Sequence, residues 1–222
     1  MKRFKTFLDR ATKRAGGASA LEDKLPVPKS ARGLRAIADD RYLSLMSLRT
    51  FSAGLKHSMV EAKWPAFEEA YLGFDARRVA AMSEAALEAL MKDRRLIRHW
   101  PKISAVQKNA QAMLEVAEEA GSFGAWLAGW PESDIVGLWA ELTRRFAQLG
   151  GSSAPYFLRM AGKDTFLLTP DTIKALTEAG VITRKPSAKG ELAAVQGAFN
   201  AWAAETARPL CQLSRILALS VG

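Results

Sequence analysis

Two glycines and two serines in the second half of the chain have the types and spacing of a phosphate-binding turn. Residues 149–158 read Leu-Gly-Gly-Ser-Ser-Ala-Pro-Tyr-Phe-Leu, so one helix should end at Gly150 and Gly151 and the next should begin at Ser152 and Ser153. Glycines let a backbone approach a phosphate closely, and a helix N-terminus offers N–H groups without intrahelical partners. The same residues also suit a plain tight turn between two helices, so the pattern alone leaves both interpretations open.

Two aspartates follow this hairpin and are candidates for acid–base or electrostatic chemistry. Asp171 comes directly after Pro170, in the first turn of an expected helix, and Asp164 lies in the preceding segment. A carboxylate in a first turn complements the helix dipole, and an aspartate in a loop is a common turn residue. Held at the mouth of a cleft, Asp171 could instead stabilise a developing positive charge or position a water molecule.

The elements that must position these residues are helices. Apolar residues recur at helical spacing along most of the chain, and no segment shows the alternation of a strand. We therefore expect an all-α fold with roughly ten helices. The expected helices cover residues 3–15, 39–48 (capped by Asp39 or Asp40), 65–73 (begun by Pro65), two segments capped by Asp75 and Ser83, 103–120 (closed by Gly121), 134–149 (opened by Ser133 or Asp134), 192–202 and 210–217.

Positive charge is concentrated at the N-terminus. The 222 residues have a formal net charge of +9, and residues 1–36 hold ten basic and three acidic side chains. Apolar residues at i, i+3, i+4 and i+7 predict a basic amphipathic helix over residues 3–15. Its basic face could be solvated on a docked helix, contact DNA phosphates, or serve a membrane surface or targeting signal. We expect residues 1–36 to form an N-terminal helix and linker, and residues 37–222 a helical domain.

The composition excludes several classes of protein. The single Cys211 excludes a disulfide framework and a cysteine-rich zinc site, and His57 and His99 are too few for a good metal site. No apolar run approaches the ~18 residues that span a bilayer, so we expect no membrane contact. No secretory signal is recognisable, which predicts a cytoplasmic protein, associated with the nucleoid in a bacterium. We expect a monomer that needs no cofactor.

Residues 43–120 resemble the 3-methyladenine DNA glycosylase I family in three blocks whose spacing needs no gap. The family's L-E-G-x-Q-A-G-L-S-W block is matched by Leu-Arg-Thr-Phe-Ser-Ala-Gly-Leu-Lys-His at residues 48–57. Its F-x-x-F-D-x-x-x-V-A-x-M block is matched by Tyr71, Phe74, Asp75, Val79, Ala80 and Met82. Its I-I-R-x-x-x-K-I-x-A-x-x-x-N-A block is matched by Leu96, Ile97, Arg98, Lys102, Ile103, Ala105, Asn109 and Ala110.

This resemblance implies a two-lobed helical fold of the helix-hairpin-helix DNA glycosylase type, with the hairpin at about residues 135–162. In that superfamily the hairpin's backbone amides hold a DNA phosphate, often with a bound monovalent cation, and a following segment carries a catalytic aspartate. Duplex DNA with a damaged base is the implied partner. On this chain the aspartate is Asp171, and the DNA-binding residues are Gly150, Gly151, Ser152 and Ser153, together with Arg98 and Lys102.

The chain departs from the family pattern at the base pocket and at the metal site. Arg49 replaces the glutamate that contacts the methylated base, and His57 replaces the tryptophan that ends the same block. The family's two cysteine and two histidine zinc ligands are absent, as is its N-terminal Tyr-His-Asp and Trp-Gly-Val-Pro stretch. A like-charge contact at ~4 Å costs about 4 kcal/mol at an effective dielectric near 20, so Arg49 should disfavour a cationic base unless it points away or is paired with an acid.

The implied activity is monofunctional removal of a damaged, alkylated base. The base would flip out of the duplex into a pocket near Arg49, Leu55 and His57, and Asp171 would assist cleavage of the N-glycosidic bond. Stacking would come from Phe51, Trp64 or Trp100, each of which also suits a core. The lysine nucleophile of bifunctional superfamily members has no counterpart at residues 153–155. Two other functions stay open: a glycosylase-like protein that binds DNA without cutting, and a basic helical scaffold for a protein or membrane.

Overall fold

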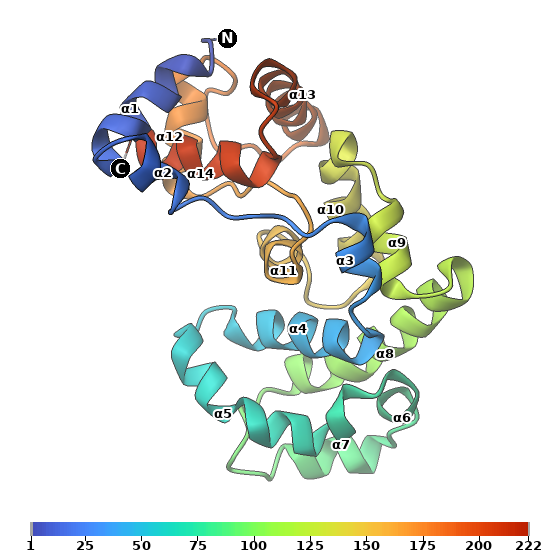
Figure 1. The fold of residues 1–222 in the computed structure, drawn as a ribbon. Helices are drawn as coiled ribbons and strands as arrows, with labels where there is room; N and C mark the ends of the chain where they lie inside the picture. Colours follow the sequence, from blue (N-terminus) through green and yellow to red (C-terminus); the bar gives the residue numbers. More distant parts are fainter. Residues whose placement is uncertain (1, 222) are drawn as a thin grey trace. The chain divides into compact units, whose positions relative to one another are not determined.

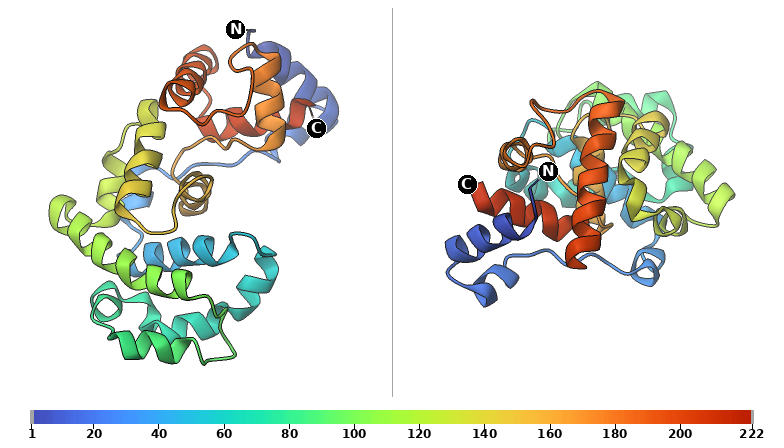
Figure 2. Two further views of the ribbon diagram at one scale, coloured as in Figure 1. Left: turned by 180° about the vertical axis from the view of Figure 1, so that it is seen from behind. Right: turned by 90° about the horizontal axis from the view of Figure 1, so that it is seen from above.

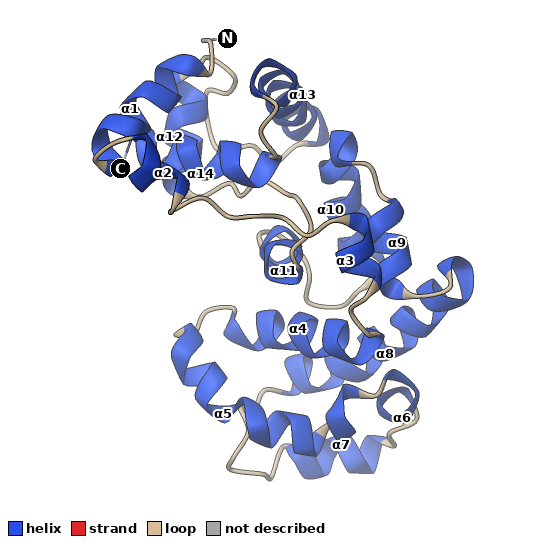
Figure 3. Cartoon of the chain, in the orientation of Figure 1, coloured by secondary structure: helices blue, strands red, loops and turns tan. Residues whose placement is uncertain are grey.

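The computed structural model describes residues 2–221, and every regular element in that part of the chain is a helix (Figures 1 and 3). The described residues form fourteen α-helices and two short 3-10 helices, which confirms the all-α fold class. None of these helices has both the length and the apolar character that crossing a bilayer requires. The chain divides into two compact units, here called the terminal unit (residues 2–29, 131–138 and 162–221) and the central unit (residues 30–130 and 139–161).

The terminal unit is built from both ends of the chain. Its helices are α1 (Lys5–Ala15), α2 (Ala18–Glu22), α12 (Pro170–Glu178), α13 (Lys189–Thr206) and α14 (Leu210–Val221), with the 3-10 helix η2 (Glu132–Asp134) and the start of α10 (Ile135–Arg145). Helices α1 and α12 both pack on α14, so the first helix of the chain lies beside the last (Figure 2).

Helix α1 docks through its apolar stripe. Phe4, Phe7 and Ala11 are fully buried. The ring centroids of Phe4 and Phe7 lie 5.6 and 6.3 Å from that of Trp202 on α13. The opposite face is exposed and carries Lys5, Lys13 and Arg14. A docked helix with a solvated basic face, the first of the three interpretations, is therefore confirmed, and contact of that face with DNA stays a prediction.

Ion pairs tie the start of the chain to α12. Lys2 Nζ lies 3.1 Å from Glu178 Oε1, and both terminal nitrogens of Arg10 donate to the same carboxylate. The hydrogen bonds from Arg10 lower the pKa of Glu178 to about 2. Residues 2–29 thus pack with the C-terminal helices, while the predicted domain boundary at residue 36 stays a prediction.

The central unit packs around α4 (Asp39–Ser52). Its other elements are α3 (Ala31–Arg35), α5 (His57–Ala70), the 3-10 helix η1 (Leu72–Phe74), α6 (Ala76–Ala80), α7 (Glu84–Leu90), α8 (Trp100–Ala120), α9 (Phe123–Gly129), the rest of α10, and α11 (Ser153–Ala161). Helices α5, α8 and α11 all contact α4. The sequence predicts an apolar stripe of six residues in α8. Ile103, Val106, Ala110 and Met113 are buried, whereas Leu114 and Ala117 are only partly buried.

Several helix ends are those that the sequence predicts. Asp75, Ser83 and Asp134 each accept a hydrogen bond from a backbone N–H in the first turn of the helix that follows, at 2.9, 3.2 and 3.1 Å. Gly121 closes α8 in the left-handed conformation with φ 84°. Asp39, in contrast, does not cap its own helix: it lies in the first turn of α4 and accepts from the backbone N–H of Phe123 at 3.0 Å.

Several predicted helix limits are wrong, and α4, for example, continues to Ser52 instead of ending at residue 48. Pro65 does not begin a helix but lies inside α5, which starts at His57. The carbonyl of Glu61 loses its intrahelical donor there, and Glu61 is exposed, so water can satisfy that carbonyl at little cost. Helix α10 ends at Arg145 rather than near residue 149, because the chain turns at Gln148, whose φ is 63°.

Candidate nucleic-acid interface and base pocket

The predicted hairpin joins α10 to α11 through residues 146–152. Gly150, Gly151 and Ser152 are exposed, whereas Ser153 is only 7% exposed. Gly151 has φ 61°, and a Cβ added there would meet no atom within 4 Å. The backbone at this turn is therefore open to an approaching group, which is what a phosphate contact through backbone amides requires.

A buried asparagine on α8 holds the hairpin turn. Asn109 is 1% exposed, and its Nδ2 donates to the carbonyl of Ala147 at 3.1 Å. The backbone N–H of Ala147 donates in return to Asn109 Oδ1 at 2.7 Å. From within α10, Thr143 Oγ1 donates to the carbonyl of Leu149 at 3.2 Å. These hydrogen bonds hold the turn in one conformation, so the turn loses less conformational entropy when a ligand binds.

Arg49 is partly buried, and no acid of the described chain pairs with it. It lies in the last turn of α4, and its Cζ is 4.9 Å from the ring centroid of Tyr156 on α11. This is the geometry of a cation–π contact. Its Nε is buried and has no hydrogen-bond partner among residues 2–221. Burial lowers the pKa of the guanidinium, and Tyr156 partly offsets that effect.

Lys102 adds a second cation to the same part of the central unit. From the first turn of α8, its Nζ donates to the carbonyls of Phe51 and Ala53 at 3.3 and 2.8 Å, at the C-terminal end of α4. Burial lowers its pKa, and the positive charge of Arg49 lowers it further. Lys102 is thus held by the carbonyl end of a helix, where a cation is favourable, and its role in DNA binding stays a prediction.

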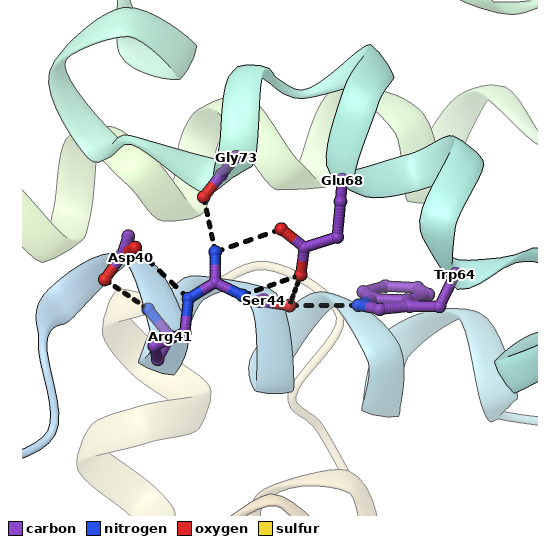
Figure 4. A network of polar contacts seen from close by, with 6 residues as sticks. All are labelled: Asp40, Arg41, Ser44, Trp64, Glu68 and Gly73. Atoms are coloured by element: carbon purple, nitrogen blue, oxygen red, sulfur yellow. Dashed lines mark hydrogen bonds and ion pairs between the residues drawn. The ribbon is translucent and has the colours of Figure 1, made fainter.

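Trp64 belongs to a polar network between α4 and α5 (Figure 4). Its Nε1 donates to Ser44 Oγ at 2.9 Å, and Ser44 Oγ donates to Glu68 Oε1 at 2.7 Å. Arg41 binds both oxygens of Glu68, at 2.9 and 3.0 Å, and the carbonyl of Gly73 at 2.6 Å. Burial opposes the charged form of Glu68, but these hydrogen bonds outweigh it and lower the pKa. Glu68 is therefore already neutralised by Arg41.

The structure places two of the predicted stacking residues in an aromatic core. Phe51 is fully buried, with its ring centroid 4.5 Å from that of Phe67. The ring of Trp64 stacks on Phe67 at 4.9 Å and on Phe74 at 5.4 Å. The third candidate, Trp100 at the start of α8, is 37% exposed and has a free surface for stacking.

The remaining predicted pocket residues lie at the turn between α4 and α5. Leu55 is 41% exposed. His57 is also exposed: its Nδ1 lies 3.1 Å from Ser52 Oγ and its Nε2 lies 3.3 Å from Glu61 Oε1. His57 is therefore a surface histidine engaged by its neighbours at both nitrogens. Arg98, which precedes α8, is exposed.

The two aspartates of the sequence analysis have different surroundings within the terminal unit. Asp171 is exposed in the first turn of α12, whose cap is Thr169. Asp164 is 9% exposed and accepts from the backbone N–H groups of Leu210 and Cys211 at 2.9 and 2.8 Å. Asp164 therefore fastens the start of α14 and is a structural residue, whereas the Asp171 carboxylate is free to meet a ligand.

No metal centre forms from the described residues, because no three His, Cys, Asp or Glu side chains among them gather at one point. The family's zinc therefore has no set of ligands in this part of the chain.

No role was predicted from the sequence for Asn109 or Tyr156. Asn109 stood in a matched family block, which was a signal, whereas nothing in the sequence pointed to the contact of Tyr156 with Arg49.

The sequence profile of the methyladenine glycosylase family matches residues 32–153, more than half of the chain. The chain therefore belongs to this family. The DNA-3-methyladenine glycosylase of Haemophilus influenzae is 33% identical over 75 residues, which are 34% of this chain and 40% of that protein. The chain thus matches less than half the length of this curated relative.

Solved structures give the same family and fold. A variant of 3-methyladenine DNA glycosylase I from Staphylococcus aureus superposes with a TM-score of 0.52 at 25% identity, over 56% of this chain and 77% of that one. The 8-oxoguanine glycosylase/lyase of Methanocaldococcus jannaschii, solved with a 15mer DNA that contains 8-oxoguanine, superposes with a TM-score of 0.53 at 11% identity. That match covers 95% of this chain and 94% of the other, and it shows the fold alone.

Proposed function

We propose that this protein is a monofunctional DNA glycosylase that flips a damaged, alkylated base out of duplex DNA and hydrolyses its N-glycosidic bond. A base inside the duplex is out of reach of an active site, so flipping must precede the chemistry. The observation that carries the proposal is the hairpin turn at residues 146–152, open at Gly150 and Gly151, held by Asn109 and belonging almost entirely to the family-matched segment.

Each part of the proposed reaction falls to residues already described. Backbone amides from Gly150 to Ser153 would hold one phosphate, and a monovalent cation at the turn could assist. Arg49, Leu55, His57 and Trp100 would surround the flipped base. Asp171 would stabilise the oxocarbenium-like transition state or orient the attacking water. Residues 146–161 contain no lysine, so we propose hydrolysis without a lyase step.

A second candidate function is DNA binding without base release. The observation that favours it is Arg49, which occupies the place of the family's glutamate without an acid beside it. Such a protein would keep the hairpin and lose the reaction. Both functions predict that log K falls steeply with log salt, by about 0.9 per phosphate neutralised, whereas a protein or membrane scaffold predicts no DNA affinity. In either case we propose a monomer that acts on DNA at the nucleoid.

The test is mass spectrometry of the free bases released from methylated, oxidised and deaminated duplex DNA, by the wild type and by Asp171→Asn. A base released by the wild type and lost with the variant supports the enzyme and the role of Asp171. Release that survives the substitution keeps the enzyme and removes Asp171 from the mechanism. Salt-dependent binding without release of any base selects the second function, and no DNA binding contradicts both.

A further inference from the structure

The surroundings of Arg49 hold a second cation and no counter-ion from the described residues. One face of the guanidinium is covered by the Tyr156 ring at 4.9 Å, and Nε is buried without a partner in the described chain. A buried donor without a partner is costly, and a guanidinium offers five donors in a fixed fork. The two terminal nitrogens are not buried and make no hydrogen bond within the described chain, so they are open to an acceptor from a ligand.

The charged groups around Arg49 do not neutralise it. Lys102, from α8, is a second cation, and its pKa is lowered by the charge of Arg49. On α5, Glu68 is bound by Arg41, and Glu61 lies beside His57 at 3.3 Å. On α11, the residue that touches Arg49 is the uncharged Tyr156. The electrostatic potential around Arg49 is therefore positive. Arg49 stands at the position where the family pattern has a glutamate.

We propose that this pocket selects an uncharged damaged base that presents oxygen or ring-nitrogen acceptors to Arg49, and that it rejects the cationic N-alkylated bases. This inference rests on the proposed function and names its substrate class. A guanidinium donates in pairs to neighbouring acceptors such as the O6 and N7 edge of a guanine-like base. A base that carries its own positive charge meets repulsion from both Arg49 and Lys102 in a half-buried, weakly screened site. Neutral O-alkylated and deaminated bases satisfy the condition.

The test measures binding of small model bases by the full chain, so that it does not depend on catalysis. The neutral model base is 9-methylhypoxanthine, and the permanently cationic one is 3,9-dimethyladeninium. In both, a methyl group at N9 takes the place of the sugar. Binding is followed through the NMR signal of the Arg49 Nε–H group. We expect the neutral base to shift this signal and to bind at least about tenfold more tightly than the cation, because two like charges in a half-buried site repel the cation.

Charge reversal supplies the matched comparison. Arg49→Glu should invert the preference, so that the cation binds at least about tenfold more tightly than the neutral base. Arg77→Glu, an equal reversal at an exposed arginine of α6, should leave the preference unchanged. If Arg49→Glu unfolds, Arg49→Gln takes its place and should weaken the preference for the neutral base, with the repulsion from Lys102 remaining.

The outcomes separate this inference from the proposed function. Equal or tighter binding of the cation by the wild type overturns the inference, even if the protein releases bases from DNA. A shift caused by inorganic phosphate, with none caused by either base, also overturns it, because the pocket would then be an anion site. Preference for the neutral base in a protein that releases no base from any DNA upholds the pocket's selectivity and contradicts the enzymatic function.

Discussion

Both units pack aromatic rings, but the central unit adds buried polar contacts that hold a hairpin, whereas the terminal unit joins the two ends of the chain through rings and ion pairs. In the central unit, Asn109 binds Ala147 and Lys102 binds the end of α4. In the terminal unit, Phe4 and Phe7 pack on Trp202, and Lys2 and Arg10 bind Glu178. The family match covers almost all of the central unit but only residues 131–138 of the terminal unit.

The two units therefore differ in how closely they follow the family pattern. The blocks that match the family lie in the central unit, and Asn109 from one of them holds the turn that we propose binds DNA. Arg49 stands within those same blocks, where the family pattern has a glutamate, and contacts Tyr156. Asp171, which we propose as the catalytic carboxylate, lies in the terminal unit. A neutral base is a poorer leaving group than a cationic base and gains more from such a carboxylate. We therefore expect mutations in the two units to have separable effects.

The largest effect on stability is expected from the aromatic cluster. Phe4→Ala removes a fully buried ring and should cost about 3–5 kcal/mol in the free energy of unfolding, measured by urea denaturation. Hydrogen exchange should quicken in α1 and α14 before it quickens in α8. Phe67→Ala, an equally buried ring of the central unit, should give the reverse order. The same order in both variants would contradict the separation of the units.

The next largest effect is expected from Asn109, whose two hydrogen bonds to Ala147 hold the hairpin turn. Asn109→Ala leaves the N–H and carbonyl of Ala147 without partners, so we expect a loss of about 2–4 kcal/mol in unfolding free energy and at least tenfold weaker DNA binding. Asn200→Ala is the control in the terminal unit. Its Nδ2 donates to the exposed carbonyl of Ser133 at 2.8 Å, and its Oδ1 accepts from Gln196, which keeps a backbone carbonyl as another acceptor, so the change should cost under about 1 kcal/mol. If Asn109→Ala binds DNA as tightly as the wild type, the hydrogen bonds of Asn109 do not preorganise the turn.

A smaller effect distinguishes the two aspartates of the terminal unit. Asp164→Ala should cost about 2 kcal/mol, because two backbone N–H groups at the start of α14 lose their acceptor. Asp171→Asn should change stability by less than about 0.5 kcal/mol, since the side chain is exposed, while it should reduce base release. Thermal melts of both variants beside the release assay check this, and strong destabilisation by Asp171→Asn would make Asp171 structural.

The smallest effect is pH-dependent. The pKa of Glu178 is about 2 in the folded protein against an ordinary value of 4.5, so its stabilisation is present above pH 4.5 and is lost as the pH falls toward 2. The side chain is 31% exposed, so we expect under about 1 kcal/mol. Glu178→Gln should flatten the acid limb of the stability curve, whereas Glu205→Gln, at an exposed glutamate, should not. An unchanged acid limb in Glu178→Gln would mean that the ion pair contributes nothing measurable.

Much of the fold could be predicted from local patterns in the sequence. The stripe of α8 and the caps Asp75, Ser83 and Asp134 depend on residues three or four positions apart; the caps are confirmed, and four of the six stripe residues are buried. Pro65 misled the prediction because proline is favoured in a first turn, while the packing of α5 against α4 carries the helix through it.

The candidate site was less predictable, because its decisive contacts join distant parts of the chain. The sequence showed that Arg49 replaces a glutamate but could not show that its partner is Tyr156, on another helix. Asp164 and Asp171 look equally suited to a turn or a helix start, and only the position of α14 makes the first a structural residue. No local pattern encodes such contacts.

The most direct test of the account is the identity of the base that the wild-type protein releases from duplex DNA carrying a cationic N-alkylated base and a neutral damaged base in equal amounts. Mass spectrometry of the free bases reads both products in one sample. We predict release of the neutral base, with Arg49→Glu shifting the ratio toward the cationic one. Preferential release of the cationic base by the wild type, or release of neither base, would contradict the account.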